Sequence, residues 1–249
     1  MPGLPDILLK RFTPETRLVF FTGAGISAES GIPTFRDKDG YWSKYDPMRL
    51  ARVRGFQADP ELVWNWYLYR RKKIRSVKPN PGHLAITKFQ KLFPHSCVIT
   101  QNVDGLHNQA GNQNIYELHG NIFTTRCLEC RRELDVPVIF DLAETGIPRC
   151  DCGGLARPGV VWFGESLPVE TLSAAMTQVQ QADVLFSIGS STAVYPAAQI
   201  PFDAKNNGAV VIEINPDQTP FTSHADLALT EPSGVVLPKL FKELYAAVA

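Results

Sequence analysis

The stretch "TGAGISAESGIPTFR" at residues 22–36 decides the fold class. It follows the apolar run "RLVFF" at 17–21, which has the length of a buried strand. From residue 23 to residue 28 it has the spacing G-x-G-x-x-A: Gly23 permits a tight turn, Gly25 lets the backbone approach a pyrophosphate, and Ala28 lets a helix pack closely on the strand. This predicts a nucleotide-binding α/β domain, although small residues also serve any tight strand-to-helix connection. The continuation "ESGIPTFR" is polar and broken by proline, where a dinucleotide-binding protein would normally continue as a helix.

Three more apolar runs have the length of buried parallel strands: "SCVIT" (96–100), "DVLFSIG" (183–189) and "AVVIEIN" (209–215). Polar or glycine residues follow each of them, and helical patterns at 81–93, 171–182 and 235–248 lie between or after them. This alternation predicts a Rossmann-like, doubly wound parallel sheet. Because ligands bind outside the carboxyl ends of such strands, we expect the polar ends to form one shared site.

Two stretches interrupt the alternation, and we expect them to form a small helical and zinc-binding module from residues 37–80 and 122–155. The first holds an aromatic helix candidate at 60–74, and the second holds four cysteines. The remaining segments, 1–36, 81–121 and 156–249, are assigned to the large, Rossmann-like nucleotide-binding domain.

The composition excludes several classes of protein. The chain has 25 basic and 25 acidic residues, so it carries no charge excess that would attract nucleic acid or an anionic membrane. It has no run of eighteen apolar residues, and its start lacks the features of a signal peptide. We therefore expect a soluble, cytoplasmic protein.

Four of the five cysteines cluster at Cys127, Cys130, Cys150 and Cys152. In a reducing compartment such a cluster indicates metal ligands sooner than disulfides, and four thiolates suit one closed, structural zinc site. The alternative is four free cysteines in a loop. The spacing of "CLEC" is ordinary for zinc, whereas "CDC" has a single intervening residue, which could weaken binding.

Two further motifs carry functional groups. "TQNVDGLH" (100–107) follows a predicted strand, so that Gln101, Asn102 and Asp104 can face a ribose or a carboxamide, or alternatively form an Asx-rich turn that caps a helix. In "ELHG", His119 is matched to taking a proton near neutral pH, although a lone histidine is more often structural.

These motifs together resemble the sirtuins, the NAD-dependent protein lysine deacylases, and most closely their bacterial and archaeal branch. The resemblance also rests on "RPGVVWFGE" (157–165), "GSS" (189–191) and "EINPD" (213–217), which occur in the family's order. It implies that the tail after the glycine loop folds over NAD, whose nicotinamide–ribose bond is cleaved in a site that must exclude water. It also implies that the cofactor is a co-substrate and that the products are nicotinamide, the free lysine and O-acyl-ADP-ribose.

The resemblance implies roles residue by residue. His119 is the expected general base and Asn102 is expected to take part in catalysis, while His83, His95, His107 and His224 are expected to be caps or surface groups. The residues expected to bind NAD are Gly23, Ala24, Gly25, Ser27, Ala28, Glu29, Pro33, Thr34, Phe35, Arg36, Trp42, Gln101, Asn102, Val103, Asp104, Gly189, Ser190, Ser191, Asn215, Pro216, Asp217 and Ser233. The "CDC" pair departs from the family, in which two or more residues separate the second pair.

Acylated-lysine proteins or peptides are the expected partners of a chain assumed to be monomeric. The residues expected to bind them are Tyr67, Arg70, Val160, Val161, Trp162, Phe163, Gly164 and Glu165, the last six as a strand that pairs with the substrate backbone. Tyr67 and Arg70 lie at i and i+3 and match the Tyr-x-x-Arg pattern of the sirtuins that remove succinyl and malonyl groups. The alternative for this helix is an aromatic core stripe (Trp64, Trp66, Tyr67) beside a solvated basic end (Arg70, Arg71, Lys72, Lys73).

The resemblance therefore implies a desuccinylase and demalonylase that also removes acetyl groups. Three alternatives remain: a deacetylase with little preference for acidic acyl groups, an NAD-dependent oxidoreductase on a Rossmann core, and a non-catalytic zinc module that binds partners. The second lacks a ribose-binding acid after a second strand, and the third leaves His119 and "QNVDGLH" without a role.

Overall fold

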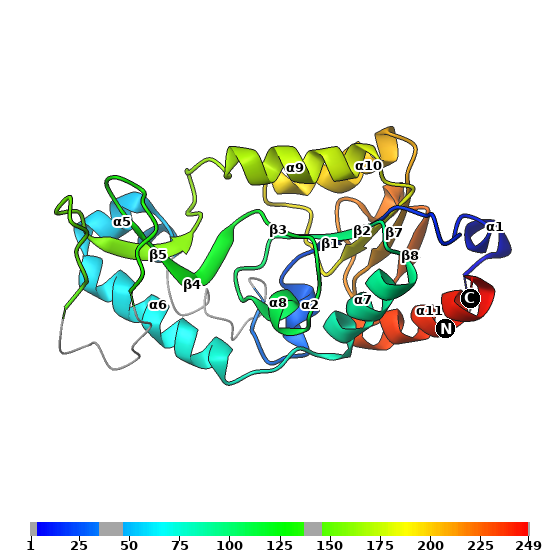
Figure 1. The fold of residues 1–249 in the computed structure, drawn as a ribbon, viewed down its shortest axis with the longest axis horizontal. Coiled ribbons are helices and arrows are strands. Elements are labelled where there is room, and N and C mark those ends of the chain that lie inside the picture. The colour runs from blue at the N-terminus through cyan, green and yellow to red at the C-terminus, as the bar shows by residue number, and fades with distance from the viewer. Residues whose placement is uncertain (1–3, 35–46, 137–145, 249) are drawn as a thin grey trace.

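The computed structural model describes residues 4–34, 47–136 and 146–248, and its main element is a six-stranded sheet in the order β3-β2-β1-β6-β7-β8 (Figure 1). All neighbouring strands are parallel. The strands are β1 (Leu18–Thr22), β2 (Ser96–Thr100), β3 (Ile115–Glu117), β6 (Val184–Ile188), β7 (Val210–Ile214) and β8 (Leu227–Leu229). Every residue of β1, β2 and β6 is buried, which explains their continuous apolar sequences. The predicted doubly wound sheet is confirmed.

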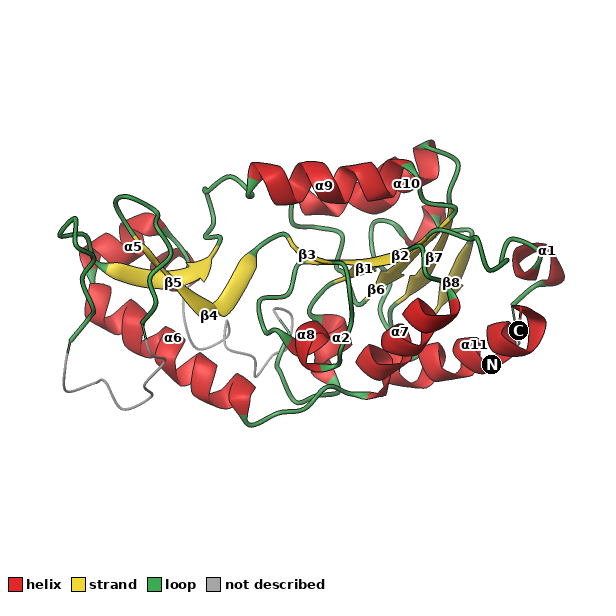
Figure 2. Cartoon of the chain, in the orientation of Figure 1, coloured by secondary structure: helices red, strands yellow, loops and turns green. Residues whose placement is uncertain are grey.

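Helices cover both faces of this sheet. The helices α7 (Pro81–Leu92) and α11 (Ser233–Val248) lie on one face, and α9 (Val169–Gln180) and α10 (Ile200–Asn206) lie on the other (Figures 1 and 2). Side chains alternate between these layers along β1: Phe20 packs with α7 and α11, whereas Val19 and Phe21 pack with α9 and α10. The short elements are α1 (Asp6–Leu9), α2 (Gly25–Ala28), α8 (Leu106–Gln109), η2 (Ala197–Gln199) and η3 (Thr222–His224).

A smaller module lies beyond β3, at the left of Figure 1. It consists of α4 (Pro47–Leu50), α5 (Val53–Ala58), α6 (Pro60–Arg75) and the antiparallel pair β4 (Gly120–Cys127) and β5 (Ala156–Val160). Its core is separate from the two cores of the sheet and contains Phe56, Trp64, Tyr67 and Trp162. Asp59 caps α6 by accepting a hydrogen bond from the Leu62 N–H at 3.1 Å, and Pro60 follows at the first helical position.

The alternative interpretation of α6 placed Arg71 in a solvated basic end, and for Arg71 that interpretation is wrong. Its side chain is 2% exposed and donates hydrogen bonds to the carbonyl oxygens of Ile122 and Thr124 in β4. Lys72 and Lys73 are exposed as expected. Arg71 therefore attaches α6 to the small sheet.

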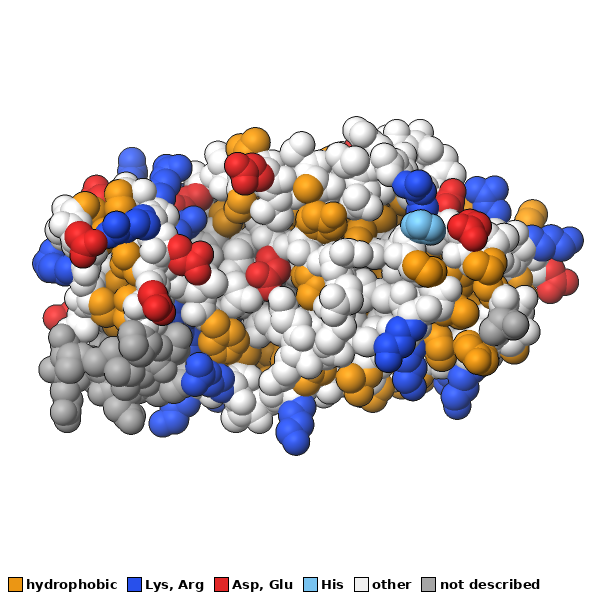
Figure 3. All heavy atoms as spheres, viewed as in Figure 1, with side chains coloured by type: hydrophobic (Ala, Val, Ile, Leu, Met, Phe, Trp, Pro, Cys, Tyr) orange, Lys and Arg blue, Asp and Glu red, His pale blue; other side chains and the backbone are white. Residues whose placement is uncertain are grey.

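Among the described helices, none is both long and apolar enough to cross a membrane. On the face drawn in Figure 3, acidic and basic side chains are interspersed over the described residues.

Candidate functional site

The strand order places the switch point of the sheet between β1 and β6. The chain proceeds from β1 through β2 to β3 on one side and from β6 through β7 to β8 on the other. In such sheets the ligand crevice lies outside the carboxyl ends of the strands at this point. The glycine loop after β1 and the "GSS" loop after β6 both start there.

Three glycines allow these two loops to touch. A Cβ on Gly23 would lie 2.7 Å from Ser190 Cα, and one on Gly25 would lie 2.6 Å from Gly189 Cα. Gly189 itself has a φ of +57°, and a Cβ there would lie 2.4 Å from the Ile26 nitrogen. The Gly25 N–H donates to the Gly189 carbonyl at 2.9 Å. The glycines therefore have a packing function in addition to the pyrophosphate approach expected from the sequence.

A buried polar cluster joins the glycine loop to the "TQNVDGLH" motif. Asn102 donates through Nδ2 to the Gly23 carbonyl at 3.0 Å and to Ser27 Oγ at 3.2 Å. Ser27 Oγ donates in turn to Asp104 Oδ2 at 2.8 Å. Asp104 also accepts from the Leu106 N–H at 2.9 Å, so the Asx turn expected as an alternative is present as well, although no side chain caps the helix α8 that follows. Asn102 and Asp104 are 8% and 7% exposed, and their orientations are fixed by these bonds.

The ends of β2, β6 and β7 meet at Ser190. Gln101 donates through Nε2 to Ser190 Oγ at 2.9 Å, and Asn215 donates through Nδ2 to the Ser190 carbonyl at 2.8 Å. Asn215 Oδ1 accepts from the Asp217 N–H at 3.2 Å. The structure thus brings together the polar groups from four strand ends, β1 included, as the sequence predicted. Hydroxyl, amide and carboxylate groups beside a glycine loop form a donor and acceptor set that fits a dinucleotide.

His119 lies between β3 and β4, where the chain passes from the large sheet to the small module. Its Nδ1 is 2.9 Å from the Gln101 carbonyl oxygen, which can only accept, so Nδ1 carries the proton. The lone pair of the neutral ring is therefore on Nε2. Burial lowers the pKa of His119, and the hydrogen bond to the Gln101 carbonyl partly opposes this shift. A half-buried, neutral imidazole with a defined basic nitrogen can act as a general base.

Several residues of the predicted cofactor loop have other contacts or lie outside the described residues. Glu29 accepts hydrogen bonds from the Gly234 N–H at 2.7 Å and from Ser233 Oγ at 3.3 Å, at the first turn of α11. Pro33 and Thr34 are half-buried. Phe35, Arg36 and Trp42 lie outside the described residues.

Two histidines that were expected to be caps or surface groups are buried, and for them this expectation is wrong. His83 and His107 are 0% and 2% exposed, and their rings meet edge to face at 4.9 Å. The ring nitrogens of His107 lie 2.9 Å from Thr22 Oγ1 and 2.7 Å from Asn112 Oδ1. Burial lowers the pKa of both rings, that of His83 to about 3 with a further contribution from His107. His95 and His224 are exposed, in line with the prediction.

The four clustered cysteines have the geometry of a zinc site. Their Sγ atoms all lie within 4.8 Å of one another, with 3.4 Å between Cys127 and Cys152 and 3.7 Å between Cys130 and Cys150. Four sulfurs at about 2.3 Å from a tetrahedral zinc would be about 3.8 Å apart. A tight turn, closed by the Cys150 N–H and the Gly154 carbonyl at 2.8 Å, lets the short "CDC" spacing turn both thiols to one centre. The cluster is positioned to bind structural zinc.

Tyr67 and Arg70 lie side by side on α6. The guanidinium carbon of Arg70 is 5.6 Å from the ring centroid of Tyr67 and 4.8 Å from that of Trp66. Tyr67 is 2% exposed, and its hydroxyl accepts from Trp162 Nε1 at 2.9 Å. The aromatic stripe of the alternative interpretation is also present, because Trp64 and Trp66 are buried.

The segment from Val160 to Glu165 is extended only at its start. β5 ends at Val160, the Val161 N–H donates to the His119 carbonyl at 2.8 Å, and residues 163–165 form a turn in which Gly164 has a φ of +90°. The expected strand over all six residues is therefore wrong for 163–165. Glu165 instead accepts from Arg157 at 2.6 and 2.9 Å and from the Trp162 N–H at 2.8 Å, which closes the turn.

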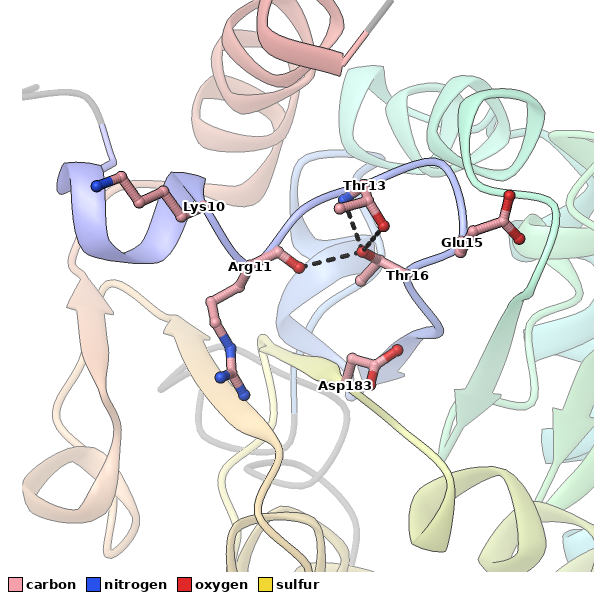
Figure 4. Close-up of a pocket in the computed structure, with 6 residues that line it drawn as sticks. All are labelled: Lys10, Arg11, Thr13, Glu15, Thr16 and Asp183. Atoms are coloured by element: carbon pink, nitrogen blue, oxygen red, sulfur yellow. Dashed lines mark hydrogen bonds between the residues drawn. The ribbon is translucent and has the colours of Figure 1, made fainter.

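A surface cavity of about 360 Å³ lies at the opposite edge of the sheet (Figure 4). Its lining residues precede the amino ends of β1 and β6; they are Lys10, Arg11, Thr13, Glu15, Thr16 and Asp183. Since the groups described above lie at the carboxyl ends, this cavity is no part of the candidate site.

Comparisons with known proteins agree with this geometry. The model of the Sir2 family matches residues 23–196. A protein of Aquifex aeolicus (strain VF5) named NAD-dependent protein deacylase is 52% identical over 231 residues, which cover 91% of this chain and 95% of the relative. Among solved structures, an ADP-ribose complex of a Sir2 homologue superposes with a TM-score of 0.91 at 44% identity and covers 98% of both chains. A Sir2 complex with a p53 peptide and NAD+ gives a TM-score of 0.81 at 32% identity and covers 96% of this chain and 97% of that one.

Proposed function

We propose that this chain, which belongs to the Sir2 family, removes succinyl and malonyl groups from lysine side chains of proteins, with acetyl groups as weaker substrates. The broader activity is that of a sirtuin, an NAD-dependent protein deacylase. The products of the proposed reaction are nicotinamide, the free lysine and O-acyl-ADP-ribose. The observation that carries the proposed selectivity is the contact between Tyr67 and Arg70 on α6.

NAD would supply the ribose carbon to which the acyl group is transferred. The residues proposed to hold it are those that meet at the switch point: the glycine loop, Gln101 to Asp104, Gly189 to Ser191, and Asn215 to Asp217. The hydrogen bond from Asn102 to the Gly23 carbonyl supports this assignment, because it fixes an amide beside the loop that would face the pyrophosphate. Structural zinc would be held by four cysteines of the small module, Cys127, Cys130, Cys150 and Cys152.

His119 is the proposed general base. With Nδ1–H bound to the Gln101 carbonyl, Nε2 is free to take a proton from a ribose hydroxyl. The lowered pKa supports this role, because the ring stays neutral at physiological pH. Val160 and Val161, which lie next to His119, are proposed to contact the substrate peptide. Trp162 to Glu165 are proposed to line the same site.

The acidic acyl group is proposed to lie against Tyr67 and Arg70. An apolar pocket would bury a carboxylate at high cost, whereas a guanidinium and a phenol hydroxyl offset its desolvation. The pKa of Tyr67 is raised by burial, against the opposing charge of Arg70, so its hydroxyl keeps its proton and can donate.

Replacing Arg70 with Met tests this selectivity. We expect the KM for a succinyl-lysine peptide to rise at least about tenfold, since a hydrogen bond to a charged group contributes ~1.5 to 3 kcal/mol. The KM for the matching acetyl-lysine peptide should change little. Lys72→Met, which removes an exposed cation from the same helix, serves as the control and should leave both values unchanged. Equal losses on both peptides for Arg70→Met would show that Arg70 is structural and would refute the acidic-acyl proposal.

A further inference from the structure

The hydrogen bond between Trp162 and Tyr67 joins two parts of the small module that are 95 residues apart in sequence. Trp162 lies in the turn after β5, and Tyr67 lies in the middle of α6. Each side chain is 2% exposed, and the distance from Nε1 to Oη is 2.9 Å. The bond is thus buried and of normal length.

The direction of this bond is fixed by chemistry. An indole N–H can only donate, so the phenol oxygen of Tyr67 is the acceptor. The hydroxyl hydrogen of Tyr67 remains, and over the described part of the chain no acceptor for it is found. A buried hydroxyl hydrogen without an acceptor costs free energy, which a bound ligand carrying an acceptor would recover.

We propose that Trp162 is a positioning residue for acyl selectivity: its indole N–H occupies one acceptor site of Tyr67 and so directs the phenol hydrogen toward an acidic acyl group beside Arg70. This inference rests on the proposed function, and it adds a residue from outside α6 to the recognition of the acyl carboxylate. Without the indole N–H, the hydroxyl of Tyr67 could rotate away and present a lone pair, which would repel a carboxylate.

The ring of Trp162 is held rigidly enough to serve this purpose. The guanidinium carbon of Arg157 lies 3.4 Å from the ring centroid, a close cation–π contact, and Arg157 is paired with Glu165. Glu165 also accepts from the backbone N–H of Trp162 at 2.8 Å. The ring of Phe56 packs against the indole of Trp162, with 5.4 Å between the two ring centroids. The indole is therefore held by the cation–π contact with Arg157, by the backbone hydrogen bond to Glu165 and by the ring of Phe56.

Burial alone does not explain why the indole N–H of Trp162 is paired with the hydroxyl of Tyr67. Trp64 belongs to the same core and is 3% exposed, yet its Nε1 has no hydrogen-bond partner within the described residues. An indole N–H can thus remain unpaired in this module, and Trp64 supplies a matched control in the same helix as Tyr67.

The experiment compares Trp162→Phe with Trp64→Phe in the full-length enzyme, using succinyl- and acetyl-lysine peptides of one sequence. Trp162→Phe should raise the KM for the succinyl peptide about three- to tenfold more than the KM for the acetyl peptide, which is the range of one lost hydrogen bond. Trp64→Phe should leave the ratio of the two KM values unchanged. Tyr67→Phe should reproduce the selectivity loss of Trp162→Phe, and the double variant should lose no more than Tyr67→Phe alone, since both changes remove one interaction.

The outcomes separate the inference from the proposed function. A wild-type enzyme that does not process the succinyl peptide overturns both. A wild type that does, with Trp162→Phe losing equally on both peptides or with additive effects in the double variant, overturns only the role of Trp162. If Trp162→Phe does not fold, 3-benzothienylalanine at position 162 removes the N–H while keeping the shape of the ring, and the same ratio of KM values then decides.

Discussion

At the scale of single residues, His119 is oriented by a backbone carbonyl, and no carboxylate forms part of its hydrogen bonding in the described structure. A carboxylate partner would raise the pKa of the ring, whereas a neutral carbonyl holds the tautomer with a much smaller effect. Burial therefore dominates, and the ring is a neutral base.

Replacing His119 with Tyr should reduce peptide-dependent nicotinamide release by ~2 to 4 orders of magnitude, the usual contribution of general-base catalysis. NAD binding and the thermal midpoint should change little, because the side chain makes a single hydrogen bond within the described residues. Steady-state kinetics, calorimetric NAD titration and a thermal melt measure these three quantities. Near-normal turnover by this variant would contradict the assignment.

The pH dependence follows from the lowered pKa of His119. A lowered pKa means that the ring loses its proton at a lower pH than a free histidine, so the active base persists further into the acid range. The acid limb of the profile of kcat/KM against pH should therefore lie below the ordinary histidine value of about 6.5. A limb above that value, measured with a peptide whose own groups do not titrate there, would contradict this prediction.

At the scale of elements, α6 carries two neighbouring arginines with different tasks. Arg70 lies against the rings of Tyr67 and Trp66, whereas Arg71 points to β4. Burial, with a smaller contribution from Arg75, lowers the pKa of Arg71 to about 10, so it stays charged at neutral pH.

Arg71→Met should lower the free energy of unfolding by about 2 to 3 kcal/mol, because it leaves buried carbonyl oxygens of β4 without a partner. The ratio of succinyl to acetyl activity should not change, in contrast to Arg70→Met. Chemical denaturation monitored by tryptophan fluorescence measures the first quantity. A variant with wild-type stability would show that water replaces the guanidinium.

The elements differ in how far the sequence could predict them. Five-residue apolar runs such as "SCVIT" specify buried central strands, since both faces must be apolar. The edge strands β3 and β8 have three residues each, "IYE" and "LAL", none of which is fully buried, and nothing local distinguishes them from loops. Gly164 indicates the turn at 163–165 in the sequence, but the prediction of a strand did not take this glycine into account.

Side-chain burial was harder to predict than secondary structure. Arg71 is buried because its hydrogen-bond partners come from residues about fifty positions away, and no local pattern encodes them. His83 belongs to the first turn of α7, where a polar residue suggests a cap, but Asn80 already caps this helix through Gly82. The polar strand ends were predictable because parallel topology alone brings them to one edge.

At the scale of the whole molecule, the cysteine cluster belongs to the small module, whose core is separate from those of the sheet, and we expect bound zinc to stabilise this module. Purified protein should contain about one zinc per chain. Removing the zinc with a chelator should increase amide hydrogen exchange in β4 and β5 while β1, β2 and β6 stay protected, because only the former pair borders the cysteines. Hydrogen exchange with mass spectrometry checks this, and folded, active, metal-free protein with unchanged exchange would contradict it.

The mutual packing of Gly23, Gly25 and Gly189 has a consequence for evolution. A Cβ at any of the three would collide with main chain of the facing loop, so we expect no amino-acid substitution at these positions to be tolerated. Tyr67 and Arg70 contact other side chains, so these two positions can be substituted one at a time. Under selection for a new acyl group, descendants of this gene should therefore diverge first along α6, while the loops at the switch point stay fixed.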